Sequence, residues 1–294
     1  MPIKNPLTAL AGSVLIVTLA ACGGSGSATP DVAVAETPEF ESGTTMAELS
    51  EAGSIRIGTK YDQPGFGLLG LEDEPEGFDV EIGKIIAGAM GIAPDKIEWV
   101  ETPSDVREQV LEDGDVDMVV ATYTINDERK QRVTFAGPYY VVGQSLMVAA
   151  DNDTIEGPED LKDNPDAKVC SATGTAPADN IEQYLASKDQ LVLFDVYEKC
   201  ADALRTGQVD VVTTDNAILA GFVANAEDQF KLVGEPFTEE PWGIGVTKGD
   251  IEFCEFINDT LADNQDAYSK AWDSTAGQIE GAQDPELPEL APCA

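Results

Sequence analysis

The stretch Leu111-Glu-Asp-Gly-Asp-Val-Asp-Met-Val-Val120 decides the fold, because its pattern returns as Leu204-Arg-Thr-Gly-Gln-Val-Asp-Val-Val-Thr213. In each copy the end of a helix is followed by a glycine and then by a short apolar strand. Such junctions are also common in α/β proteins without internal repeats, which is the alternative explanation. We interpret the repeated pattern as an indication of two lobes with similar folds.

Segments around both copies alternate between strand and helix patterns. The residues at 54–59 alternate between apolar and polar, as in a half-buried strand, and apolar residues recur at helical spacing from Phe78 until Gly91. Thr102-Pro103 supplies a helix cap and a first-turn proline, and Gly114 ends that helix. This alternation predicts an α/β protein with mainly parallel sheets covered on both faces. The expected strands are 54–59, 97–100, 118–121 and 168–170, and the expected helices are 78–90, 103–113 and 178–185.

The N-terminus reads as an export signal. Lys4 precedes an apolar run over residues 7–20, which is shorter than the roughly 20 residues that a membrane-spanning helix needs. Leu19-Ala-Ala-Cys22 is similar to the lipobox of bacterial lipoproteins, which implies a signal peptide over 1–21 and a lipid on Cys22. An ordinary signal peptide that happens to contain a cysteine is the alternative. Residues 22–50 are rich in Gly, Ser, Ala, Thr, Pro and Glu, which predicts a flexible tether.

Composition excludes several classes of function. The chain has 17 basic and 55 acidic residues, a formal charge of −38, which argues against nucleic acid and anionic membrane surfaces as partners. It has no histidine, the commonest general base and metal ligand, and no phosphate-loop or nucleophile motif, so we expect neither cofactor, metal nor catalysis. Four further cysteines in an exported chain indicate disulfides, and three pairings are possible: they are Cys170, Cys200, Cys254 and Cys293.

Five stretches carry a resemblance to a known family. They are Ile55-Arg-Ile-Gly-Thr-Lys60, Gly77-Phe-Asp-Val80, residues 116–129, Phe135-Ala-Gly-Pro-Tyr-Tyr140 and residues 209–215. In this order they resemble the extracellular solute-binding proteins of polar amino-acid ABC importers, family 3, and most of all its glutamate-binding lipoproteins. The resemblance covers residues 51–280, and its most specific part is residues 122–140.

The resemblance implies the type II periplasmic-binding-protein fold, with two α/β lobes joined by two hinge strands. Lobe 1 would comprise 51–143 and 240–294, and lobe 2 would comprise 144–239. It also implies the pairs Cys170–Cys200 and Cys254–Cys293, because the other pairings would staple the lobes together. The resemblance also implies a monomer that its lipid holds on the outer face of the cell membrane and that docks on ABC permease subunits.

Two charged residues are candidates for holding the main-chain groups of an amino acid. Arg129 follows a possible helix cap at Asn126, no acidic residue lies three or four positions from it, and its guanidinium fork suits a carboxylate. The resemblance assigns the α-carboxylate to Arg129, with help from Thr124 and its neighbours Thr122 and Tyr123. Asp215 closes a predicted strand and would bind the ammonium group, with a helix cap as the alternative role.

Lys60 and Arg107 decide the substrate class. Basic residues near these positions hold the side-chain carboxylate in acidic-amino-acid binders of the family, which favours L-glutamate or L-aspartate over glutamine. Solvated surface cations are the alternative. Thr173-Gly174-Thr175 would add donors from lobe 2, unless it is a plain turn.

The sequence does not decide which aromatic residues form the wall of the pocket. Trp242 and Tyr123 would line the cleft, although core positions are the alternative. Asp62-Gln63-Pro64-Gly65 departs from the family, because many relatives place an aromatic there that stacks on the ligand. The hypothesis is a carrier that closes its lobes on an acidic amino acid. A binder of glutamine or another polar amino acid, a dehydratase-like enzyme of the arogenate type on the same scaffold, and a tethered sensor remain alternatives.

Overall fold

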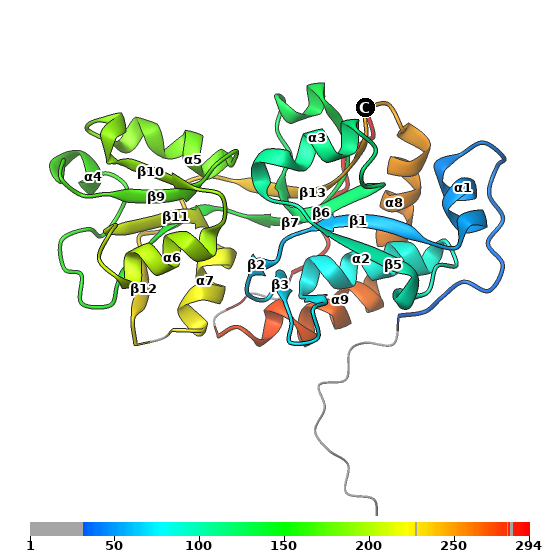
Figure 1. Cartoon of the computed structure of the whole chain (residues 1–294), viewed down its shortest axis with the longest axis horizontal. Helices are drawn as coiled ribbons and strands as arrows, with labels where there is room; N and C mark the ends of the chain where they lie inside the picture. The colour runs from blue at the N-terminus through cyan, green and yellow to red at the C-terminus, as the bar shows by residue number, and fades with distance from the viewer. Residues whose placement is uncertain (1–31, 227, 281, 283–284) are drawn as a thin grey trace, which may run out of the picture.

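The protein folds into two α/β lobes that lie side by side and are joined by two extended strands (Figure 1). The structure is a computed structural model that describes residues 32–226, 228–280, 282 and 285–294. The predicted signal peptide, Cys22 and the first part of the predicted tether lie outside these residues. No helix in the described ranges is long and apolar enough to span a bilayer.

Lobe 1 contains a five-stranded sheet in the order β5-β1-β6-β13-β7. Its helices pack on this sheet, and a small antiparallel sheet β2-β3-β4 lies beside α2 (Figure 1). The elements are α1 Thr45–Ala52, β1 Ile55–Thr59, β2 Asp62–Gln63, β3 Gly67–Leu69, β4 Pro75–Glu76, α2 Phe78–Ala89, β5 Ile97–Glu101, α3 Arg107–Glu112, β6 Met118–Thr124, β7 Val133–Val142, β13 Glu240–Thr247, α8 Ile251–Asp263 and α9 Gln265–Ser274.

Lobe 2 repeats this arrangement with a second sheet in the order β10-β9-β11-β8-β12. Its elements are β8 Gln144–Ala149, α4 Asp160–Asp163, β9 Val169–Ala172, α5 Ala176–Ile181, β10 Leu191–Phe194, α6 Tyr197–Arg205, β11 Val211–Asp215, α7 Asn216–Ala224 and β12 Phe230–Val233. The two copies of the repeated pattern become β6 and β11, and each is the central strand of its sheet. Every residue of both strands is buried, which is why both copies are apolar.

The expectation of mainly parallel sheets is wrong. In lobe 1, β1 pairs in parallel with β5 and β6, but β13 pairs antiparallel with both β6 and β7. Lobe 2 has the same balance, because β8 runs antiparallel to β11 and β12. The mixture arises because the chain crosses between the lobes along β7 and returns along β13, so the returning strand enters the first sheet in the opposite direction.

The predicted tether is also too long at its C-terminal end. From residue 32 the chain packs on lobe 1, where the N–H of Ala35 donates to the carbonyl of Gly88 at 2.9 Å. Helix α1 follows, with Thr44 as its side-chain cap and Gly53 ending it at a φ of +67°. The polar composition of the stretch conceals this short helix, whose Met46 reaches the core.

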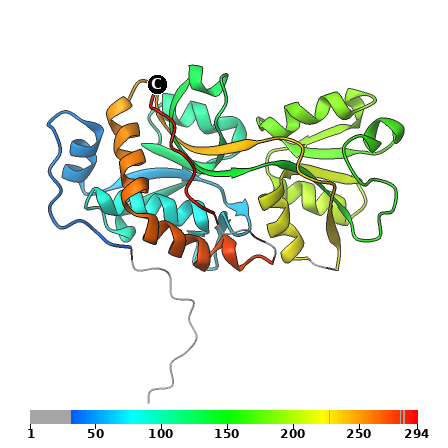
Figure 2. The ribbon, with the colours of Figure 1, turned by 180° about the vertical axis from the view of Figure 1, so that it is seen from behind.

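Both disulfides have the pairing that the resemblance implied. Cys170–Cys200 joins β9 to α6 inside lobe 2, and Cys254–Cys293 joins α8 to the C-terminal tail inside lobe 1. The tail runs along lobe 1 beside α8 (Figure 2), where the N–H of Ala291 donates to the carbonyl of Gly137 at 2.7 Å. Neither disulfide crosses between the lobes, so each leaves relative lobe motion unhindered.

Candidate functional site

A small cavity lies between the lobes where the central strands of the two sheets end. Its volume of about 10 Å³ is close to the minimum that one water molecule needs. The lobes are therefore closed against each other, and an amino acid can enter only if they separate. Its lining residues are Ser104, Arg107, Thr122 and Thr124 from lobe 1 and Thr175, Ala176, Pro177, Tyr197, Thr214, Asp215 and Ile218 from lobe 2.

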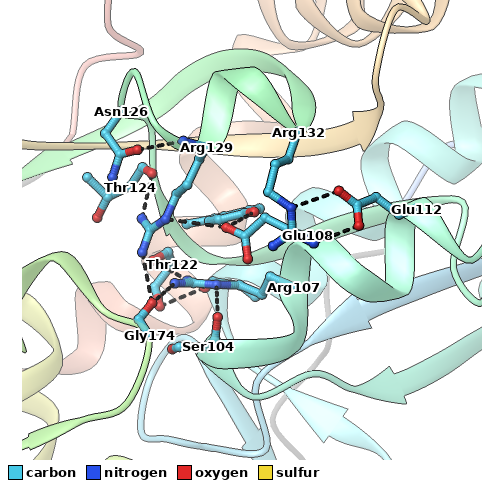
Figure 3. Close-up of polar contacts among 12 residues, drawn as sticks. Ser104, Arg107, Glu108, Glu112, Thr122, Thr124, Asn126, Arg129, Arg132 and Gly174 are labelled. Carbon is cyan, nitrogen blue, oxygen red and sulfur yellow. Dashed lines mark hydrogen bonds and ion pairs between the residues drawn. The ribbon is translucent and has the colours of Figure 1, made fainter.

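Two arginines of lobe 1 meet at one carbonyl oxygen of lobe 2 (Figure 3). Arg129 donates through Nη2 to the oxygen of Gly174 at 3.0 Å, and Arg107 approaches the same oxygen at 3.5 Å. The ring of Tyr123 supports both cations, with its centroid 4.2 Å from Cζ of Arg107 and 5.2 Å from Cζ of Arg129. The arrangement brings two guanidinium groups to one acceptor, and guanidinium groups are well suited to binding carboxylates.

Arg129 has an ion-pair partner that the local sequence did not reveal. Its Nε lies 3.5 Å from Oε1 of Glu108, and that same carboxylate oxygen accepts a hydrogen bond of 2.6 Å from the hydroxyl of Tyr123. The sequence showed no acidic residue three or four positions from Arg129, but it could not show Glu108, which belongs to α3. The helix expected after Asn126 is a single 3-10 turn, Arg129–Gln131, and Oδ1 of Asn126 accepts from the N–H of Arg129 at 2.9 Å.

Lys60 and Arg107 are buried, which removes the alternative of solvated surface cations. Lys60 is 3% exposed, and its Nζ donates to the hydroxyl of Ser104 at 2.7 Å. Burial, with a smaller contribution from repulsion by Arg107, lowers the pKa of Lys60 to about 7. Burial and the nearby Arg129 lower the pKa of Arg107 to about 10. The three basic groups are buried close to one another and Arg107 lines the cavity, so an anion bound there would be stabilised.

Asp215 is the acidic counterpart in lobe 2. The indole N–H of Trp242 donates to its Oδ2 at 2.8 Å, while Oδ1 is buried without a hydrogen-bond partner in the described part of the chain. Burial, with a smaller contribution from the neighbouring Glu240, raises the pKa of Asp215 to about 7. Although Asp215 precedes α7, its side chain makes no capping hydrogen bond there, so helix capping is not its role. The free oxygen suits an ammonium group.

Thr122 is held in an uncommon backbone conformation by a residue that the sequence did not single out. Its φ is +44°, a left-handed value that is unfavourable for a β-branched residue. The N–H of Thr122 donates to Oδ2 of Asp79 at 2.7 Å, and the hydroxyl of Tyr139 donates to Oδ1 at the same distance. The sequence could have pointed to Asp79, because it is an acidic residue on the buried face of the helix pattern that starts at Phe78.

The remaining candidates divide between the cavity and its surroundings. Thr175 lines the cavity and caps α5 by accepting from the N–H of Ala178 at 3.2 Å. Thr173 is exposed, and its hydroxyl donates away from the cavity to the carbonyl of Phe194. Tyr123 is buried in the core beside the arginines, and Trp242 is absent from the cavity lining but donates to Asp215 and pairs with Thr124 between β13 and β6. Tyr197 and Thr214 line the cavity without a sequence pattern that marks them.

Comparison with known proteins identifies the family. Residues 55–271 match the model of the bacterial extracellular solute-binding proteins, family 3. This chain belongs to that family. The glutamate-binding protein GluB of Corynebacterium efficiens is 40% identical over 83% of this chain and 80% of its own length. A glutamine-binding protein of Geobacillus stearothermophilus is 35% identical over 86% of this chain and 95% of its own.

A solved structure agrees with this family assignment. The ancestral amino acid-binding protein AncCDT-1, a precursor of cyclohexadienyl dehydratase, superimposes with a TM-score of 0.71 at 29% identity, covering 79% of this chain and 99% of that one. As a family 3 member, the protein is an extracytoplasmic solute-binding protein. No group of three His, Cys, Asp or Glu residues that could hold a metal occurs in the ranges described.

Proposed function

We propose that this protein captures an acidic amino acid, L-glutamate or L-aspartate, and delivers it to the permease of an ABC importer. The observation that carries the proposal is the group of three buried basic residues, Lys60, Arg107 and Arg129, of which Arg107 lines the interlobe cavity. A ligand with a neutral side chain would offer Lys60 and Arg107 no opposite charge, and uncompensated buried charge is strongly destabilising. The similarity to proteins named for glutamate binding supports the same choice.

Each group of the ligand has a partner in this proposal. Arg129 grips the α-carboxylate in place of the Gly174 carbonyl, assisted by Thr124 and Thr122 at the end of β6. The unpartnered Oδ1 of Asp215 receives the ammonium group. Lys60 and Arg107 receive the side-chain carboxylate. The ligand therefore touches both lobes, and binding stabilises the closed form relative to the open form.

The same proposal covers the location of the protein and its partners. The lipobox-like Leu19-Ala-Ala-Cys22 supports a lipid anchor on Cys22 after removal of residues 1–21. The chain would then stand as a monomer on the outer face of the cell membrane, beside its permease. It acts by binding alone, without turning over its ligand.

A thermal-shift panel with L-Glu, L-Asp, L-Gln, L-Asn and L-Arg tests the proposal. An acidic amino acid at 100 times its Kd should add about 2.7 kcal/mol to the stability. If L-Gln or L-Arg stabilises the protein while L-Glu and L-Asp do not, the roles given to Lys60 and Arg107 are wrong. Chemical conversion of any amino acid in the panel would contradict binding without turnover.

A further inference from the structure

The segment Asp62–Gly65 lies at the boundary between the lobes. Asp62 begins β2 in lobe 1 and is 6% exposed. Its Oδ2 accepts the N–H of Tyr197 at 2.8 Å, and Tyr197 is the first residue of α6 in lobe 2. A side chain of one lobe therefore satisfies the helix terminus of the other.

Helix α6 has no cap of its own. Its N-cap residue is Val196, which makes no side-chain hydrogen bond to the first turn. The first N–H groups of a helix lack intrahelical partners and carry a partial positive charge, so a carboxylate there is doubly favourable. Asp62 therefore provides the N-terminal cap of α6 from the other lobe, because the sequence next to α6 provides none.

A second contact from the same segment shows how closely the lobes meet here. A Cβ added to Gly221 of α7 would lie 2.5 Å from the carbonyl oxygen of Pro64. The backbone of lobe 1 thus rests directly on two helices of lobe 2, α6 and α7. Asp62 is absent from the cavity lining, whereas Tyr197, which it holds, is part of it.

We infer that Asp62 is a positioning residue for lobe closure, whose carboxylate caps α6 only when the lobes are closed. The inference rests on the proposed function in one respect, namely that the lobes close around an amino acid. A contact that exists only in the closed state shifts the open–closed equilibrium by the same factor for every ligand. Asp62 therefore sets how tightly the protein holds its cargo, while the cations set which cargo it holds.

The test compares Asp62→Ala with Asp62→Asn by calorimetry and by stopped-flow tryptophan fluorescence, using L-glutamate. Losing a helix cap predicts that Asp62→Ala raises the Kd by about 3- to 30-fold, mainly through faster dissociation. Asparagine caps helices about as well as aspartate, so Asp62→Asn should stay within about 3-fold of the wild type. This pair matters because the charge of Asp62 also raises the pKa of Lys60. If Asp62→Asn loses as much affinity as Asp62→Ala, the charge is responsible and the inference is overturned.

Asp250→Ala provides the matched control. Asp250 caps α8 entirely within lobe 1, accepting from the N–H of Phe253 at 3.1 Å. Its loss should lower the melting temperature and leave the Kd unchanged. An unchanged Kd in Asp62→Ala would overturn the inference. If the wild type binds L-glutamine and not L-glutamate, the proposed function fails, but the same variants measured with L-glutamine still test Asp62.

Discussion

Replacing Lys60 by methionine is expected to stabilise the unliganded protein and to weaken its binding of an acidic amino acid. Methionine matches the length of the lysine stem without its charge. With a pKa lowered from 10.5 to about 7, the buried ammonium group destabilises the fold by about 4 kcal/mol at pH 7. Replacing buried charges by apolar groups of similar volume gains about 1–4 kcal/mol in other proteins. We expect a gain in this range for Lys60→Met.

Ligand binding should change in the opposite direction. Arg107 remains in the variant, so the side-chain carboxylate keeps one of its two cationic partners. Losing the other should cost about 2 kcal/mol, which raises the Kd for L-glutamate by roughly 30-fold. The Kd for L-glutamine should change by less than about 3-fold, because its amide does not need the charge. Urea unfolding of the unliganded protein and titration calorimetry with both amino acids measure these effects.

The pH dependence gives a further check on the cause. Below pH 7 Lys60 is charged in both the folded and the unfolded state, so the destabilisation is complete. Between pH 7 and 10.5 Lys60 is neutral in the folded state and charged in the unfolded state. The free energy of unfolding of the wild type should therefore rise, relative to that of the variant, by about 1.4 kcal/mol per pH unit. A variant that is less stable than the wild type and binds L-glutamate equally well would refute the reasoning.

Three other changes test the site and its support. Gly174→Ala should weaken ligand binding at least tenfold by calorimetry, because Gly174 has a φ of +73° and an added Cβ would lie 2.7 Å from Cα of Asp105 in the other lobe; an unchanged Kd would show that the lobes close differently. Asp215→Asn should raise the Kd at least about 30-fold, since the ammonium group loses a buried charged partner, and a smaller change would remove Asp215 from the ammonium site. Cys293→Ser opens the link to Cys254, which spans 39 residues, and should lower the unfolding free energy by about 2–4 kcal/mol without changing the Kd; an altered Kd would mean that the tail acts on the site.

The repeated helix–glycine–strand pattern predicted the two lobes correctly. It was visible because β6 and β11 are buried on both faces and are therefore mostly apolar. The direction of β13 left no such signature, since its pairing depends on where the chain re-enters lobe 1. The disulfide pairing came from the family's lobe division and not from the spacing of the cysteines. The tether was misjudged because the short helix α1 is stabilised by packing on lobe 1 and not by its composition.

The candidate site was only partly visible in the sequence. Of the predicted residues, Arg107, Thr122, Thr124, Thr175 and Asp215 line the cavity, whereas Lys60, Tyr123, Arg129 and Thr173 are absent from its lining. Local sequence could not show that Glu108 pairs with Arg129 or that Asp79 holds Thr122, because these partners lie 21 and 43 positions away. The contact of Asp62 with α6 depends on lobe closure, a property that belongs to no single segment.

Calorimetric titration of the protein with L-glutamate and L-glutamine at pH 7 measures whether the site prefers an acidic side chain to an amide. The buried Lys60 and Arg107 should select the ligand with the additional negative charge. We expect a Kd near 1 μM for L-glutamate, about −8 kcal/mol, and a Kd at least tenfold higher for L-glutamine. Equal or tighter binding of L-glutamine would contradict this expectation.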